Sequence, residues 1–98
     1  MDTRRDPAIE RTIDLFKALA HPLRLQLVQL LAQGDRAVHE LVDELDATQP
    51  LVSQHLRVLR GARLVRADRY GRETRYSLVD EHVAHIVGDA VQHAAEVA

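Results

Sequence analysis

Apolar residues recur at helical spacing in five stretches of the chain. The spacing predicts helices over residues 8–20, 22–32, 38–45, 49–61 and 80–97. Before the last stretch the period changes, and two short β-tolerant runs, 64–69 and 73–78, flank a turn that contains Gly71. Such runs around a glycine-containing turn are typical of a β-hairpin. The pattern therefore predicts a mostly α-helical fold with one β-hairpin, in the order four helices, hairpin, helix.

Two of the predicted helices are joined as in DNA-binding proteins. Thr48 offers a hydroxyl that can cap the helix over 49–61. Only three residues separate this helix from the short helix over 38–45. Two short helices with a tight joint form a helix-turn-helix, whose second helix enters the major groove of DNA. We therefore interpret residues 38–61 as a helix-turn-helix.

Length and composition narrow the class of protein. The 98 residues form one small domain, which gains stability by pairing because so short a chain buries a modest core. The chain has no cysteine, which excludes disulfides, thiolate metal sites and cysteine nucleophiles. It has no apolar run near the roughly 20 residues of a membrane span. Its charged start, residues 1–10, is unlike a signal peptide. We therefore expect a cytoplasmic protein that makes no membrane contact.

The net charge of −2 conceals an uneven distribution. Residues 50–76 carry seven arginines and two acidic residues, a balance of +5, whereas the remainder has a balance of −7. Such asymmetry suggests one face built for an anion. A solvated basic hairpin explains the charge equally well. The charge alone therefore does not distinguish an anion-binding face from an ordinary solvated surface.

The helix over 49–61 carries polar side chains that suit DNA. Glutamine can pair with adenine through two hydrogen bonds, and serine can reach base edges or phosphate. Arginines further along the helix and on the hairpin suit phosphate or the minor groove. The candidate DNA-binding residues are Gln49, Ser53, Gln54, His55, Arg57, Arg69, Arg72 and Arg75. The alternative is an ordinary helical core with a polar surface.

A family resemblance rests on two segments, ALAHPLRLQLVQLL (18–31) and QPLVSQHLRVLRGARLVRADRYGRETRYSL (49–78). They resemble the ArsR/SmtB family of winged-helix repressors, and the resemblance extends over residues 9–97. Its most specific part is VSQHLRVL, followed by LV and a hairpin with Gly-Arg at its turn. One departure is Arg63, where many relatives have glycine.

The resemblance implies a single winged helix-turn-helix domain over residues 1–98 that works as a homodimer. The helices over 8–20 and 80–97 would join two copies. The helix over 49–61 and the wing over 64–78 would bind double-stranded DNA that carries an inverted-repeat operator.

The last predicted helix carries a stripe of potential metal ligands. At about 100° per residue five of its metal-capable side chains fall within an arc of about 80°. They are His82, His85, Asp89, His93 and Glu96, with Asp80 just before them. Apolar residues occupy the neighbouring arc: Val83, Ile86, Val87, Ala90, Val91 and Ala94. The helix therefore combines an apolar seam for a partner with a ligand stripe along its edge.

One copy of this helix cannot close a metal site, because His82 and His93 lie about 16 Å apart along the axis. Zinc ligands lie about 2.0–2.2 Å from the ion. Two antiparallel copies, with a two-fold axis near Gly88, place Asp80 and His82 beside His93 and Glu96 of the partner subunit. Symmetry then makes two identical sites. Two imidazoles and two carboxylates suit four-coordinate zinc, and the same four residues match the family's site on its C-terminal helix.

Two further residues leave the metal open. His85 and Asp89 could support the ligands, lie on the surface, or complete a six-coordinate nickel or cobalt site. The sequence ends two residues after Glu96, which favours zinc, because nickel sensors that resemble this chain recruit ligands from longer tails. The family's other site uses Cys-x-Cys where this chain has Ala37 and His39, which argues against arsenic, cadmium or lead sensing there. The resemblance also implies that His93 donates to a backbone carbonyl near Arg63.

These features predict a zinc-responsive transcriptional repressor in which zinc lowers the affinity for DNA. The alternatives are a nickel or cobalt regulator, in which metal could instead promote DNA binding, and a metal-independent dimeric winged-helix regulator with incidental histidines. A zinc hydrolase needs an open coordination position and a substrate pocket, and no long pocket-forming loop is evident. We therefore expect no enzymatic activity and no small-molecule substrate.

Overall fold

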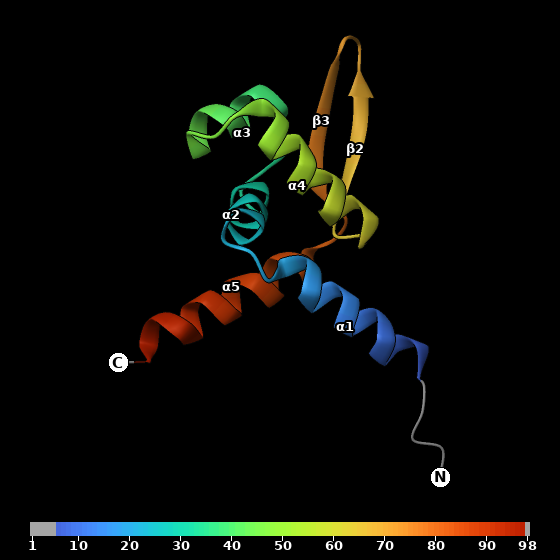
Figure 1. Cartoon of the computed structure of the whole chain (residues 1–98), viewed down its shortest axis with the longest axis vertical. Helices are drawn as coiled ribbons and strands as arrows, with labels where there is room; N and C mark the ends of the chain where they lie inside the picture. Colours follow the sequence, from blue (N-terminus) through green and yellow to red (C-terminus); the bar gives the residue numbers. More distant parts are fainter. Residues whose placement is uncertain (1–5, 98) are drawn as a thin grey trace.

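The computed structural model describes residues 6–97, which form five helices and three strands (Figure 1). The elements are α1 (Pro7–Leu19), α2 (Pro22–Leu31), β1 (Arg36–Ala37), α3 (Val38–Leu45), α4 (Gln49–Gly61), β2 (Val65–Tyr70), β3 (Glu73–Leu78) and α5 (Glu81–Glu96). The two helices of the predicted helix-turn-helix begin and end where the pattern places them. The other predicted elements agree to within one residue at each end.

The strand β1 was not predicted from the pattern. It pairs antiparallel with β3, with Arg36 opposite Tyr76 and Ala37 opposite Arg75. β3 therefore lies between β1 and β2 in a three-stranded sheet, which corrects the prediction of a hairpin alone. A strand of two residues is too short to show an alternation in sequence. Its consequence is that the wing is attached to the start of α3.

The core gathers around α2, which packs against α3, α4 and α5. Its buried side chains are leucines and valines from six elements and the turn before β2. They include Leu19, Leu27, Val28, Leu31, Leu41, Val52, Leu56, Leu59, Leu64, Val65, Val83 and Val87. Burying each such side chain contributes about 1.5–3 kcal/mol. The core therefore holds the helix-turn-helix, the root of the wing and the first half of α5 together.

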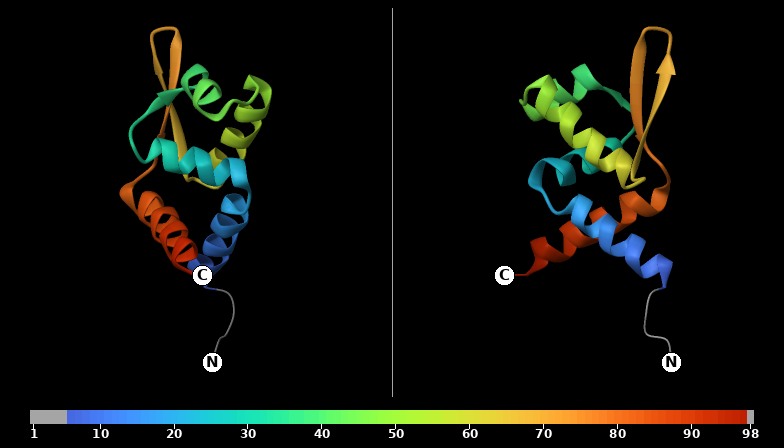
Figure 2. Two further views of the ribbon diagram at one scale, coloured as in Figure 1. Left: turned by 90° about the vertical axis from the view of Figure 1, so that its left-hand side faces the viewer. Right: turned by 45° about the vertical axis from the view of Figure 1, so that its right-hand side comes forward.

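The helices α1 and α5 both lie at the end of the molecule opposite the wing tip (Figures 1 and 2), and in Figure 1 they project from the body toward opposite sides. Their outer faces leave large apolar side chains in solvent: Ile9, Ile13, Phe16 and Val91. The predicted partner seam of α5 is corrected in one respect. Val83 and Val87 are buried within their own chain. The helical period could not predict this, because it does not show which part of an apolar arc faces the core of the same chain. Within residues 6–97, no helix is long and apolar enough to cross a membrane.

The turn after α4 has a backbone conformation that favours glycine, although this chain has Arg63 there. Arg63 has φ 62°, in the left-handed region that favours glycine. The joint between α3 and α4 contains a similar residue, Asp46, with φ 51°. Thr48 caps α4 as predicted, because its hydroxyl accepts from the N–H of Leu51 at 3.4 Å. Both tight turns thus set the direction of α4 relative to its neighbours.

Candidate functional site

The start of α4 faces the wing across an open groove of about 450 Å³. Gln49 and Ser53 line it from the helix side, and Arg72 and Thr74 line it from the hairpin. Gln54 and other exposed side chains follow along α4. The structure therefore brings several of the candidate DNA-binding residues to one side of the molecule, between the reading helix and the wing.

His55 does not belong to this surface, which corrects its place among the candidate DNA contacts. It is 7% exposed, and its ring lies 4.3 Å from that of His21. An Nη1 of Arg24 lies 3.2 Å from its Nδ1. Burial, and then the charges of His21 and Arg24, lower the pKa of His55. His55 therefore joins α4 to the start of α2, where a DNA base cannot reach it.

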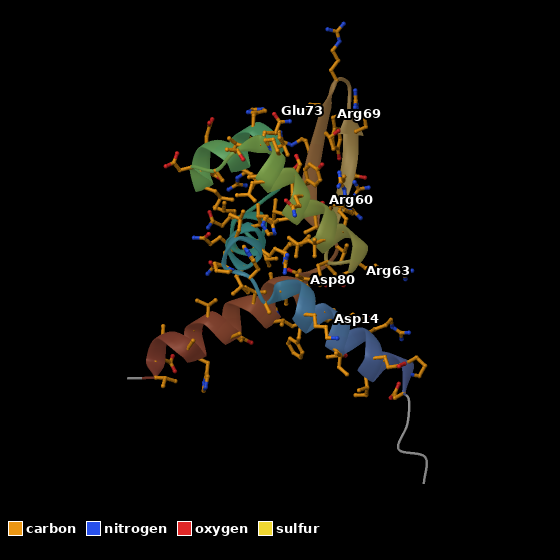
Figure 3. The ribbon with its side chains drawn as sticks, in the orientation of Figure 1. Asp14, Arg60, Arg63, Arg69, Glu73 and Asp80 are labelled. Carbon is orange, nitrogen blue, oxygen red and sulfur yellow. The ribbon has the colours of Figure 1, made fainter. Side chains whose placement is uncertain are left out.

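The wing arginines differ in their surroundings. Arg72 is exposed in the turn at the tip. Arg69 is also exposed, and its Nε donates to the carbonyl of Gly71 at 2.9 Å. Figure 3 shows Arg69 on the hairpin and Arg60 on α4 near the root of the wing. Arg57 is exposed on α4 as well. These positions keep positive charge available along the helix and the wing.

Arg75, another candidate DNA contact, is half-buried and paired with carboxylates of its own chain. Its guanidinium lies 3.0 Å from a carboxylate oxygen of Asp35, 3.0 Å from one of Glu73 and 3.3 Å from one of Glu40. It also donates to the carbonyl of Asp35 at 3.2 Å. The hydrogen bonds to Asp35 and Glu73 raise the pKa of Arg75. The guanidinium therefore forms ion pairs with three carboxylates of its own chain. Because Asp35 lies 40 residues from Arg75 in the sequence, no periodic pattern could predict this pairing.

The predicted metal ligands all lie exposed on or beside α5: Asp80, His82, His93 and Glu96, with His85 and Asp89 between them. Asp80 is the N-cap of the helix, and its carboxylate accepts from the N–H of Val83 at 3.3 Å. Glu96 accepts from the amide of Gln92 at 3.2 Å. Within residues 6–97 of one chain, no three potential ligands come together. Binding one ion with these four residues therefore needs a second copy of the chain.

A hollow of about 650 Å³ adjoins the first two of these ligands. Asp80 and His82 line it together with Asp14 of α1 and Arg63 after α4. Figure 3 shows Asp14, Asp80 and Arg63 around the place where α1, α5 and the end of α4 meet. The candidate metal residues therefore border the turn that follows the reading helix.

Residues 21–67 match the family model of the "Bacterial regulatory protein, arsR family". The "HTH-type transcriptional repressor SmtB" of Mycobacterium tuberculosis is 54% identical over 83 residues, which cover 85% of this chain and 62% of that protein. The chain thus spans about 62% of the length of this curated relative. The "HTH-type transcriptional regulator KmtR" of the same organism is 40% identical over 93 residues, or 95% of this chain and 72% of that protein.

A solved structure resembles the whole fold. It is a homodimeric winged helix-turn-helix DNA-binding domain from Mycobacterium bovis, a possible ArsR-family transcriptional regulator. It shares 31% sequence identity with a TM-score of 0.86, over 99% of this chain and 93% of that chain. The match confirms the predicted winged helix-turn-helix fold. The two curated relatives are both named as transcriptional regulators.

Proposed function

The chain belongs to the ArsR family of bacterial regulatory proteins, and from this premise we propose that it is a zinc-responsive transcriptional repressor that binds DNA as a homodimer. The observation that carries the proposal is the shared face of the reading helix and the wing. There, polar side chains that suit base edges adjoin exposed arginines that suit phosphate.

The proposed DNA contacts follow from this face. Gln49, Ser53 and Gln54 read base edges from the start of α4. The phosphate contacts are made by Arg57, Arg69 and Arg72, all of them exposed. A symmetric dimer presents two such faces, so its operator is an inverted repeat.

The exposed apolar faces of α1 and α5 support dimerisation. Ile9, Ile13 and Phe16 on α1 are each about half exposed, at 59%, 48% and 56%, and Val91 on α5 is 37% exposed. Contiguous apolar surface of this kind marks interaction sites in small proteins. Gly88 is open to solvent within its own chain, since a Cβ there meets nothing within 4 Å. A second α5 can therefore approach closely at this point.

Zinc is the proposed ligand of the paired helices. Asp80 and His82 of one subunit would hold it with His93 and Glu96 of the partner subunit. The two imidazoles and two carboxylates match the ligand types that zinc takes in proteins. A bound ion supplies a charged cross-link between the subunits, and it does so beside the turn at Arg63 that follows the reading helix. Since zinc would favour one arrangement of the two reading heads, it changes their affinity for DNA.

A nickel- or cobalt-responsive regulator is the second candidate. It is supported by His85 and Asp89, which are exposed on the same edge of α5 as the four proposed ligands. Recruiting them would raise the number of ligands toward the six that such ions accept.

The test is DNA binding by the purified protein with zinc, cobalt, nickel or chelator in parallel. The operator is first selected from random-sequence duplexes by the metal-free protein. Zinc is expected to weaken binding by 5- to 150-fold, the range of typical allosteric coupling, and chelator is expected to restore it. A variant with Asp43→Asn, an exposed carboxylate of α3 outside the ligand set, should respond as the unmodified protein does. A larger response to nickel or cobalt supports the second candidate, and no response to any metal contradicts both.

A further inference from the structure

The cluster around Arg75 joins the wing to the helix-turn-helix. Asp35 precedes β1, Glu40 belongs to α3, and Glu73 begins β3. All three carboxylates lie within 3.3 Å of the guanidinium of Arg75. Glu40 also accepts from the backbone N–H of Ala37 at 2.8 Å. A single side chain thus ties together the sheet, the loop before it and the start of α3.

A second contact extends the cluster across the groove. His39 of α3 lies 3.2 Å from Glu73 through its Nε2. Figure 3 shows Glu73 on the side of the hairpin that faces α3, and Arg69 on the opposite side. Because Glu73 and His39 both line the groove with Gln49 and Ser53, the cluster lies at the edge of the proposed DNA-binding face.

The root of the wing is also held by Tyr76 and Leu78 of β3, which pack against the core. The pairing of β1 with β3 covers only two residue pairs. Beyond it, the hairpin rises away from the helices toward its tip at Gly71 and Arg72 (Figure 1). The angle of the wing relative to α4 therefore depends on the core contacts of its root, on a short ladder and on the ion pairs of Arg75.

We propose that Arg75 is a positioning residue for DNA binding: it sets the angle of the wing through Asp35, Glu40 and Glu73 and does not contact phosphate. This inference rests on the proposed DNA-binding function. Acidic groups beside a DNA-binding face normally weaken DNA binding by repulsion. Here Asp35 supports binding, since it holds the arginine that orients the wing.

The decisive variant is Asp35→Asn, which removes one negative charge and loosens Arg75. If Arg75 positions the wing, affinity for the selected operator falls by about 3- to 10-fold, and the slope of log K against log salt stays as in the unmodified protein. If Arg75 is instead a phosphate contact that Asp35 masks, affinity rises and the slope becomes steeper. Asp43→Asn is the matched control, because Asp43 is an exposed carboxylate of α3 that is not among the partners of Arg75.

Two arginine variants provide the complementary comparison. Arg72→Ala is expected to lower the salt slope by about one, as for the loss of one phosphate contact. Arg75→Ala is expected to lower affinity with a smaller change in slope. The effects of Arg75→Ala and Asp35→Asn should be less than additive, because both act through one cluster.

A measurement without DNA separates this inference from the proposed function. Heteronuclear ¹⁵N relaxation of the free protein is expected to show greater mobility at residues 70–74 in Arg75→Ala and Asp35→Asn, with the melting temperature nearly unchanged. Unchanged mobility and unchanged affinity in both variants would overturn the positioning role. If the unmodified protein shows no salt-dependent DNA binding, the proposed function fails instead, whatever the relaxation data show.

Discussion

His55 lies where burial and two neighbouring basic groups act in the same direction. Its pKa is lowered from the ordinary value of 6.5, first by burial and then by His21 and Arg24. The neutral ring also suits its neighbour, because an unprotonated Nδ1 can accept from Arg24 at 3.2 Å. The folded chain therefore holds His55 neutral at a pH where the same side chain in the unfolded chain binds a proton.

This difference predicts a pH-dependent stability. The contribution is fully present above pH 6.5 and is lost as the pH falls from there through the folded-state pKa, because the unfolded state then binds more protons. We expect a lower urea midpoint at pH 5.5 than at pH 7.5. His55→Gln should reduce this difference between the two conditions, whereas His85→Gln, an exposed control on α5, should preserve it. An equal pH dependence in His55→Gln and the unmodified protein would contradict the assignment.

Arg63 gives a second prediction for a single residue. A non-glycine residue in the left-handed region carries a penalty of about 1–2 kcal/mol, and Arg63 has φ 62°. Arg63→Gly is therefore expected to raise the free energy of unfolding by about 1 kcal/mol, after the greater flexibility of glycine in the unfolded chain is allowed for. Arg63→Ala retains the Cβ and should bring no such gain. Equal urea midpoints for the two variants would show that the backbone at this turn is unstrained.

At the scale of elements, local signals predicted the helices well. Thr48 and the prolines mark the starts of α2 and α4 through caps and first-turn preferences, which depend on neighbouring residues alone. The ion pair between Arg75 and Asp35 joins residues 40 positions apart, so no local pattern could reveal it. The sequence predicted His55 on the surface of α4, because its burial against the start of α2 depends on the tertiary fold. The four ligands on α5 remain a prediction, because one chain does not bring them together.

The helix α5 divides its apolar residues between two tasks. Val83 and Val87 face the core of their own chain, and Val91, one turn further on, is left in solvent. Gly88 lies between them, with open space around the position of a Cβ. The division is set by where α5 leaves the body, which the tertiary fold decides and the period of the helix does not.

Gly88→Leu is therefore expected to weaken the dimer and leave the single chain folded. A Cβ at this position meets nothing within 4 Å in its own chain, and leucine is a better helix former than glycine. Between two closely approaching helices, however, it overpacks the contact. Sedimentation at micromolar concentration should show a dimer for the unmodified protein and a shift toward monomer for the variant. Gln26→Leu, which adds the same side chain to an exposed position of α2, serves as the control and should remain dimeric.

At the scale of the whole molecule, a continuous series of packed residues joins the reading helix α4 to the candidate metal residues of α5. The turn at Arg63 ends the path of α4, and it lines the same hollow as Asp80 and His82. The proposed dimer brings His93 of the partner subunit to these two residues. A ligating histidine usually donates its other ring N–H to an acceptor nearby, and the family resemblance places that acceptor on the backbone near Arg63. In the proposed dimer His93 would thus have two roles, as a ligand and as a link to the turn after the reading helix.

The two histidines are therefore expected to fail differently when they are replaced. His82→Ala removes a proposed ligand and should abolish tight zinc binding. Because no zinc is then bound, zinc should no longer change the affinity for DNA. His93→Asn keeps a side chain that can bind weakly while it loses the ring N–H that reaches the turn. It should retain measurable zinc binding and lose most of the 5- to 150-fold coupling expected between zinc and DNA. The measurement is a four-state cycle for each variant, with zinc affinity determined in the presence and absence of operator DNA and DNA affinity determined with and without zinc. Reciprocity requires both routes to give the same coupling, which checks each cycle internally. If His93→Asn retains the full release from DNA by zinc, the coupling passes through Asp80 and the wing root at Leu78 instead of through the turn at Arg63.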